Sequence, residues 1–399
     1  MNTIGIVCEY NPFHNGHAMH IQKSRERLGE DSLVLCAMSG DFVQRGEAAI
    51  YSKFARAEAA CRCGADLVLE LPLPWSLSSA EGFARGAVGL LGRMGASHVC
   101  FGSETGDLGP LERIAKNLLF PGIQREVKAR LAEDGSLSYA AARQLVLVDR
   151  MGEEAELLRQ PNNILAVEYI KALYDLGLDM QPVPIRREGS LHDAPSTVTG
   201  LKSASEIRRM LSQGKRIEGE VPPAALSIYS REHLHGRELI RDALEQAYLS
   251  RLRMLPESAF EQLPDGANGL GRRLYRAVRE EASLDAILAA TKTKRYAMAR
   301  IRRLTLCACL GIQPEMSAGI PPYARILAAN KRGCEYLRQR ETESLFPIVS
   351  KPAHVKQLSS DCAHLFAIGA SAHDLYVLGY RTQGERKPGL DWRTGPKII

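Results

Sequence analysis

The chain has 399 residues, of which 45% are apolar and 25% are charged, a composition typical of a globular protein with a well-buried core and two or three domains. No apolar stretch approaches the roughly 20 residues that a membrane-spanning helix needs, and no secretory leader is recognisable before the first predicted strand, so we expect a cytoplasmic protein. The nine cysteines lack C-x-x-C pairs and zinc-ligand spacing, which favours reduced thiols over a metal site.

The net charge of +6 is unevenly distributed along the chain. Residues 1–200 hold 20 Lys and Arg against 25 Asp and Glu, whereas residues 201–399 hold 32 against 21. A second half with a net charge of +11 favours a polyanionic partner, and nucleic acid is the leading candidate. A basic surface without a partner is the alternative.

The first 200 residues alternate short apolar runs with helical patterns. The predicted strands are Thr3–Cys8, Leu33–Met38, Asp66–Leu71 and His98–Phe101. The predicted helices between them are Asn15–Leu28, Lys53–Cys63 and Ala80–Leu91. This alternation predicts βαβ units, and therefore an α/β, Rossmann-like fold with a parallel sheet covered on both faces. Such sheets bind ligands beyond the carboxyl ends of their strands.

From about residue 203 the pattern becomes mostly helical. The predicted helices are Ser203–Gln213, Gly236–Arg253, Gly271–Glu281, Tyr296–Leu310 and Pro322–Arg340. We therefore predict a ligand-binding α/β domain over residues 1–215 and a helical, basic region over residues 216–399, with nucleic acid as the candidate partner of the second. The stretch Arg381–Ile399 is polar and broken by Gly and Pro, which predicts a loosely held tail.

The segment Glu9–His17 follows the first predicted strand and opens the first helix. Gly16 leaves room for phosphate oxygens at the backbone, and His14 and His17 share one face of the helix start. Free N–H groups and the positive helix end favour an anion there. Two imidazole donors would stabilise the charge on a departing pyrophosphate. We therefore predict that His14 and His17 are catalytic; a chance surface pair and two zinc ligands are the alternatives.

The segment Glu9–His17 resembles the H-x-G-H signature of the nucleotidyltransferase superfamily, whose members activate the α-phosphate of ATP and release pyrophosphate. Ser203–Arg209 resembles a second superfamily element, which grips the triphosphate. The resemblance implies phosphate contacts from Ser203, Ser205 and Arg208. A plain helix cap with Glu206 in the first turn is the alternative.

Further segments resemble the bacterial tRNA(Met) cytidine acetate ligases over most of the chain. These segments are Ser39–Glu47, Gly64–Pro72, Phe101–Glu104, Pro161–Leu165, Thr293–Tyr296 and Tyr323–Leu327. Members of that family join acetate to AMP and pass the acetyl group to N4 of the wobble cytidine of elongator tRNA(Met). The resemblance implies ATP with Mg²⁺ as a substrate, and acetate and tRNA as partners. The acid, the tRNA and the wobble position come from the resemblance alone.

The resemblance also implies which residues bind ATP. They are Val7, Cys8, Glu9, Tyr10, Asn11, Pro12, Phe13, His14, Asn15, Gly16, His17, Ala18, Met19, His20, Gly102, Asn162 and Arg187. Asn163 and Arg186 are adjacent alternatives. Family members usually have a tyrosine-like residue before His-Asp, whereas this chain has Ser-Leu before His192-Asp193, which weakens any role for that loop.

Arg45 and Asp41 follow the second predicted strand, at the ligand edge of the sheet. We expect the carboxylate substrate or the incoming cytidine near them, and Asp41 could accept the proton that the cytidine amine loses. A turn aspartate with a solvated arginine is the alternative.

Residues 291–303 contain six Lys and Arg and no acidic residue. We predict tRNA contacts from Lys294, Arg295, Arg302 and Arg303, the three arginines sharing one helix face, with Tyr296 stacking on a base. A merely solvated basic helix is the alternative.

Two other functions remain open at this point. A small-molecule adenylyltransferase would need the first domain but not the basic half. An ATP-sensing RNA-binding protein would keep both parts and release no pyrophosphate. The sequence indicates no protein partner.

Overall fold

The computed structural model describes residues 1–187, 200–267 and 269–399. Within these ranges a central sheet has the strand order β10-β8-β5-β2-β1-β6-β7, with β9 beside β8. The strands of this sheet are β1 (Thr3–Cys8), β2 (Leu33–Ser39), β5 (Leu67–Leu71), β6 (His98–Ser103), β7 (Gln181–Arg186), β8 (Ala324–Ala329), β9 (Ile348–Val349) and β10 (Lys397–Ile398).

The five strands of the first half run parallel to one another, which confirms the predicted α/β fold. Strand β1 pairs with β2 on one side and with β6 on the other, so it lies at the centre of this parallel part. Successive β2 residues enter different cores: Leu33 and Leu35 pack on one face, and Val34 and Cys36 on the other. Helices therefore cover both faces of the sheet, as predicted.

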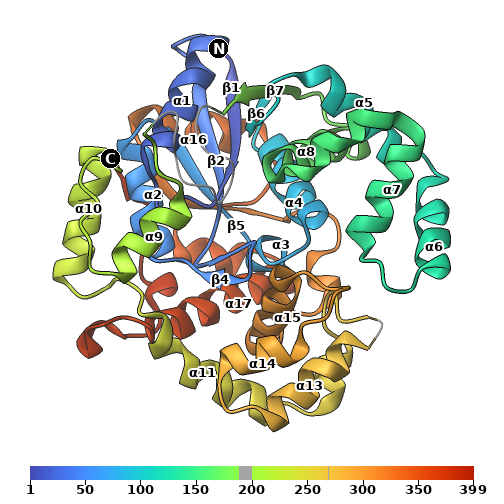
Figure 1. Ribbon diagram of the computed structural model, residues 1–399. Helices are drawn as coiled ribbons and strands as arrows, with labels where there is room; N and C mark the ends of the chain where they lie inside the picture. Colours follow the sequence, from blue (N-terminus) through green and yellow to red (C-terminus); the bar gives the residue numbers. More distant parts are fainter. Residues whose placement is uncertain (188–199, 268) are drawn as a thin grey trace.

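One face is covered by α4 (Ala80–Arg93) and α8 (Pro161–Asp175), and the opposite face by α1 (Asn15–Leu28) and α2 (Lys53–Arg62). A mostly helical part follows and gathers at the lower side of the molecule in Figure 1. It consists of α11 (Arg241–Met254), α13 (Leu270–Glu280), α14 (Leu284–Thr291), α15 (Met298–Leu310) and α17 (Ser360–Val377), which share a third core.

The remaining helices are α3 (Leu73–Ser76), α5 (Leu108–Leu118), α6 (Ile123–Glu133), α7 (Tyr139–Met151), α9 (Ala204–Ser212), α10 (Pro223–Leu234), α12 (Glu257–Glu261) and α16 (Lys331–Glu343). A separate hairpin is formed by β3 (Phe42–Val43) and β4 (Glu47–Ala48). In the described ranges, no helix is both long and apolar enough to span a bilayer.

The predicted helix Pro322–Arg340 is wrong in its first part. Residues Ala324–Ala329 form β8, which runs antiparallel to β5, and α16 begins only at Lys331. All six strand residues are buried, so their sequence lacks the polar alternation that distinguishes a strand from a buried helix.

The expectation of a loose tail is also wrong. Asp391 is fully buried, and β10 pairs in parallel with β8. Strands from beyond residue 216 thus complete the sheet of the first half, and the division between residues 215 and 216 stays a prediction. The nine cysteines are free; five are buried and four are half-buried.

Candidate active site

Residues 9–14 form a tight loop between β1 and α1, and His17 lies in the first turn of α1. The entrance of the loop is held by Arg56, a fully buried residue of α2, whose guanidinium donates to the backbone oxygens of Glu9, Ser39 and Gly40. One side chain therefore fixes the carboxyl ends of β1 and β2 relative to each other. At the far end of the loop, the Phe13 N–H donates to the Tyr229 hydroxyl over 2.8 Å.

His14 and His17 each accept a backbone hydrogen bond through Nδ1. His14 caps α1, because its Nδ1 accepts from Gly16 N–H at 3.0 Å. His17 Nδ1 accepts from His14 N–H at 3.3 Å. In a neutral imidazole that accepts at Nδ1, the proton sits on Nε2. The two rings, with centroids 3.8 Å apart, therefore carry a pair of Nε2–H donors.

The packing of His14 also explains the glycine in the motif. A Cβ on Gly16 would lie 2.9 Å from His14 Cε1, so a larger residue would displace the capping ring. The capping histidine therefore favours a glycine here, and the phosphate contact at Gly16 stays a prediction.

The histidines at this site are neutral at physiological pH. Burial, with smaller effects from Arg187 and Arg208, lowers the pKa of His14 to about 3. Burial and then the neighbouring His14 lower the pKa of His17 well below its ordinary value. Burial, followed by Arg187, lowers the pKa of His20 to about 4. At this site the arginines therefore carry positive charge and the imidazoles do not.

The structure brings Arg187 and Asn162 together. Arg187 Nη1 donates to Asn162 Oδ1 over 2.8 Å, and a Cβ on Gly102 would lie 3.2 Å from Arg187 Cδ. The adjacent alternatives have other roles. Asn163 is fully buried and accepts from Ser103 Oγ at 2.7 Å, whereas Arg186 packs against Gly106. The Ser-Leu-His-Asp departure at residues 190–193 lies outside the described residues.

Helix α9 contributes both a cap and a cation. Ser203 is its N-cap and forms a reciprocal capping box with Glu206. This helix cap is the alternative to a phosphate contact that the sequence left open. Arg208 Nη1 donates to Asn11 O at 2.7 Å, so its guanidinium lies beside the motif. Phosphate contacts from Ser203, Ser205 and Arg208 stay predictions.

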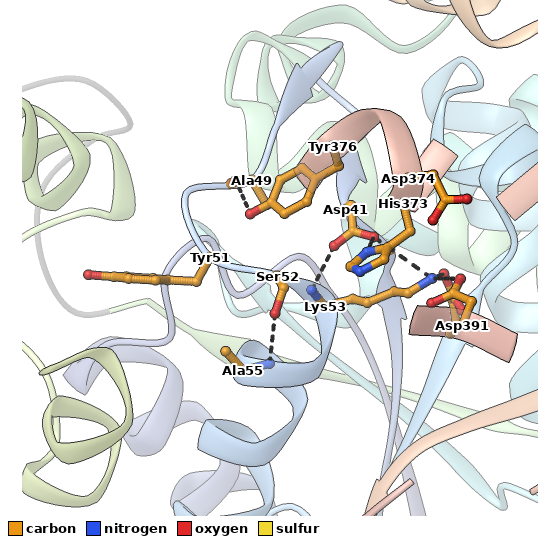
Figure 2. Close-up of polar contacts among 12 residues, drawn as sticks. Asp41, Ala49, Tyr51, Ser52, Lys53, Ala55, His373, Asp374, Tyr376 and Asp391 are labelled. Carbon is orange, nitrogen blue, oxygen red and sulfur yellow. Dashed lines mark hydrogen bonds and ion pairs between the residues drawn. The ribbon is translucent and has the colours of Figure 1, made fainter. Parts of the chain in front are cut away.

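Asp41 lies inside a buried ion cluster (Figure 2). Its Oδ1 accepts from the Lys53 N–H and its Oδ2 contacts His373 Nδ1, both at 2.8 Å. Lys53 Nζ also lies 2.9 Å from Glu70 Oε1 and 2.6 Å from Asp391 Oδ2. Burial alone would raise the pKa of Asp41, but His373 and Lys53 lower it to about 2. A sealed carboxylate with this pKa is a poor base, so the geometry does not support Asp41 as the proton acceptor.

No local sequence pattern indicates this cluster. Arg325 of β8 completes it, with its Nη1 2.8 Å from both Glu70 Oε2 and Asp391 Oδ2. The sequence predicts Lys53 only as the first residue of a helix. Its partner Asp391 and the other C-terminal members, Arg325 and His373, lie far away in the sequence. The cluster joins α2, β5, β8 and α17 directly behind the ligand edge of the sheet.

The basic segment is split by its structure. Lys294 and Arg295 are exposed in the loop before α15, so the predicted helix face shared by all three arginines is wrong. Arg302 pairs with Glu47 of the β3–β4 hairpin, and the buried Arg303 donates to Gln44 O at 3.3 Å. Arg302 and Arg303 therefore attach α15 to the hairpin, whereas Lys294 and Arg295 are exposed to solvent.

Three comparisons identify known proteins that this chain resembles. The model of the HIGH Nucleotidyl Transferase family matches residues 1–389. The tRNA(Met) cytidine acetate ligase of Syntrophomonas wolfei is 36% identical over 99% of both chains, and that of Caldicellulosiruptor saccharolyticus is 37% identical over 84% of both. The crystal structure of apo Thermotoga maritima TmcAL superposes with a TM-score of 0.93 at 30% identity, and each chain is covered completely. A second form, bound with alpha-thio ATP, gives a TM-score of 0.91.

Proposed function

The chain belongs to the tRNA(Met) cytidine acetate ligase family, and on that premise we propose that it activates acetate with ATP and transfers the acetyl group to a cytidine of tRNA(Met). The finer assignment is to N4 of the wobble cytidine of the elongator tRNA. A tRNA substrate also supports a cytoplasmic location.

The observation that carries the proposal is the pair of Nε2–H donors on His14 and His17, held beside Arg187 and Arg208 at the start of α1. In the first step an acetate oxygen attacks the α-phosphorus of ATP, and the bond to the β-phosphate oxygen breaks. Pyrophosphate leaves with the electron pair. Neutral imidazole donors and two guanidiniums stabilise that charge without a protein nucleophile.

The remaining assignments are proposals that this geometry supports. ATP would lie against residues 7–20, with Gly102, Asn162 and Arg187 at the nucleoside end. Among the described residues, no group of three or more His, Cys, Asp or Glu side chains is arranged to hold a metal ion. Mg²⁺ would therefore arrive on the phosphate oxygens of ATP, as hard oxygen ligands favour. Lys294 and Arg295 are the exposed candidates for tRNA contact.

Labelled acetate tests the proposed function directly. The protein is incubated with bulk tRNA and labelled acetate, with and without ATP, and the tRNA is digested to nucleosides for mass spectrometry. We expect labelled acetylcytidine only with ATP, and none with the His17→Ala variant. Labelling that needs acetyl-CoA instead would contradict the proposal.

Two further results would favour the other functions. Pyrophosphate release with a small dinucleotide product and no labelled tRNA would identify a small-molecule adenylyltransferase. Binding of ATP and tRNA without pyrophosphate release would identify an ATP-sensing RNA-binding protein.

A further inference from the structure

The C-terminal segment presents an exposed tryptophan at the surface of the protein. Asp391 and Trp392 are neighbours in η5 (Leu390–Trp392), but Asp391 is fully buried in the ion cluster, whereas Trp392 is 46% exposed. The Trp392 ring meets the ring of Phe366 in α17 edge to face, with centroids 4.9 Å apart. The guanidinium of Arg325 lies 4.7 Å from the centroid of the same Phe366 ring. The buried cluster thus holds this segment in place and leaves about half of the indole open to solvent.

Two exposed cations of the same segment flank this tryptophan. Arg393 follows Trp392 directly, and its guanidinium donates to the backbone oxygens of Gly389 and Pro388. These contacts fold the chain back on itself, so Lys387, which precedes Pro388, lies close to Arg393. Both cations are exposed.

A neighbouring segment adds two more cations. η3 (Pro352–Gln357), which carries Lys356, packs against η5. A Cβ on Gly395 would lie 3.9 Å from Ser350 O, so Lys351 is close to that glycine. Both lysines are exposed. The tryptophan and the four cations are called the tail surface below: Lys351, Lys356, Lys387, Trp392 and Arg393.

The cations of the tail surface lack matching carboxylates. In the part of the chain that the structure describes, none of the four forms an ion pair. Of the four acidic residues after position 359, Asp361 is exposed. The other three are engaged in contacts within the protein: Asp374, Glu385 and Asp391. Exposed cations beside an open aromatic ring suit a nucleic acid, because phosphates pair with the cations and unpaired bases stack on the ring. A purely acidic peptide would use the cations and leave the ring exposed.

The tail surface lies at the same edge of the sheet as the ATP motif. Arg325 pairs with Glu70 near the carboxyl end of β5, and Lys351 follows β9, which pairs with the start of β8. Strands β1, β2, β5 and β8 are successive neighbours in the sheet. Three strand spacings of about 4.8 Å place β8 about 14 Å from β1. A single RNA molecule can therefore contact the tail surface and still deliver a nucleotide to the end of β1.

We propose that the tail surface binds the tRNA substrate, with Trp392 stacking on an unpaired base and the four cations holding the adjoining backbone phosphates. This inference rests on the proposed function, and it names a contact with the RNA that is separate from the loop with Lys294 and Arg295. The tail surface lies outside the ATP motif, so it serves RNA binding rather than acetate activation.

Fluorescence tests the stacking contact directly, because the protein has two tryptophans and the other, Trp75, is 2% exposed. The difference between wild type and the full-length Trp392→Phe variant isolates the emission of Trp392. We expect tRNA(Met) to quench this emission. Trp392→Leu should weaken tRNA(Met) binding by about fivefold or more, whereas Trp392→Phe keeps an aromatic ring and should stay within about threefold of wild type. Unchanged emission at saturating tRNA, or equal affinities of the two variants, would overturn the inference.

A salt titration tests the cations. Lys351→Ala together with Lys387→Ala should make the slope of log K against log salt for tRNA(Met) shallower by about two units. The matched control removes two exposed cations of α16, which begins at the opposite end of β8, by Lys331→Ala with Arg338→Ala, and should leave the slope unchanged. Equal slopes for the two double variants would overturn the inference. A Trp392→Leu variant that binds tRNA normally but sediments differently without RNA would also overturn it, because the surface would then join copies of the protein.

Acetate-dependent exchange of labelled pyrophosphate into ATP separates this inference from the proposed function. The tail-surface variants should exchange at about the wild-type rate. Loss of exchange in Lys351→Ala with Lys387→Ala would overturn the inference, because the segment would then serve the ATP site. Absence of exchange in wild type would instead refute the proposed function itself.

Discussion

Replacing Lys53 with methionine removes the central cation of the buried cluster. The Lys53 side chain is 1% exposed, and its Nζ lies 2.9 Å from Glu70 Oε1, 2.6 Å from Asp391 Oδ2 and 3.8 Å from Asp41 Oδ2. Methionine keeps the apolar part of the side chain but removes the ammonium group from the three carboxylates around it. Breaking a buried ion pair from one side costs about 3–5 kcal/mol. For 399 residues, an unfolding entropy of about 2.1 cal/mol/K per residue converts this cost into a fall in Tm of about 4–6 °C.

Differential scanning calorimetry at pH 7 measures this shift. The control is Arg241→Met, which breaks a pair with Asp285 whose side chains are 63% and 82% exposed and should lower Tm by about 1 °C or less. A Tm for Lys53→Met as close to wild type as that of the control would refute the reasoning, because it would mean that the carboxylates need no buried cation.

Three other predictions concern the site, the RNA surface and pH. His14→Ala and His17→Ala should each lower acetate-dependent pyrophosphate exchange by about 10²-fold or more with little change in Tm, and near-normal exchange would remove the proposed role. Replacing Lys294 and Arg295 together by alanine should make the slope of log K against log salt for tRNA binding shallower by about two units and leave ATP affinity unchanged; an unchanged slope would place the RNA elsewhere. The folded-state pKa values of about 3 for His14 and about 4 for His20 lie below the unfolded value of about 6.5, so the unfolded chain binds more protons and stability falls as pH drops from about 6.5 toward 4. The urea midpoint at pH 7, 6 and 5 should fall less steeply in His20→Gln than in wild type, and identical slopes would contradict this account.

The elements around the motif could be predicted from the sequence because their information is local. Strand β1 and helix α1 have the predicted bounds, Thr3–Cys8 and Asn15–Leu28. The strand is a short apolar run that stops at polar residues, and the helix follows a residue that caps it. Both features lie within about 25 residues of chain.

Elements whose state depends on distant partners could not be predicted in this way. Residues 324–329 are apolar throughout except for Arg325, and only the neighbouring β5 makes them a strand. The sequence predicts a loose tail because residues 381–399 are polar and broken by Gly and Pro, and nothing nearby marks Asp391 as buried. Asp391 is buried because Lys53 and Arg325, which are distant in the sequence, donate hydrogen bonds to its carboxylate.

In the candidate site, too, the residues that depend on local sequence could be predicted, and those that depend on distant partners could not. The loop and the proposed donors His14 and His17 follow from spacing, but the choice of Asn162 over Asn163 depends on the direction of each side chain. Asp41 was a plausible base in the sequence because His373, which engages its Oδ2, lies 332 positions away.

The buried cluster also has a consequence for synthesis on the ribosome. Lys53 and Asp391 are 338 positions apart, and at a translation rate of about 5–20 residues per second that separation corresponds to roughly 17–70 s. Until Asp391 is made, the nascent chain carries Lys53, Asp41 and Glu70 without this aspartate, and until residue 329 is made, β5 also lacks β8. The ligand edge of the sheet therefore cannot reach its final packing while the rest of the chain is still being made. A message that stops early yields a polypeptide with the complete H-x-G-H segment but an open, unbalanced core behind it, which is the kind of chain that chaperones and proteases recognise.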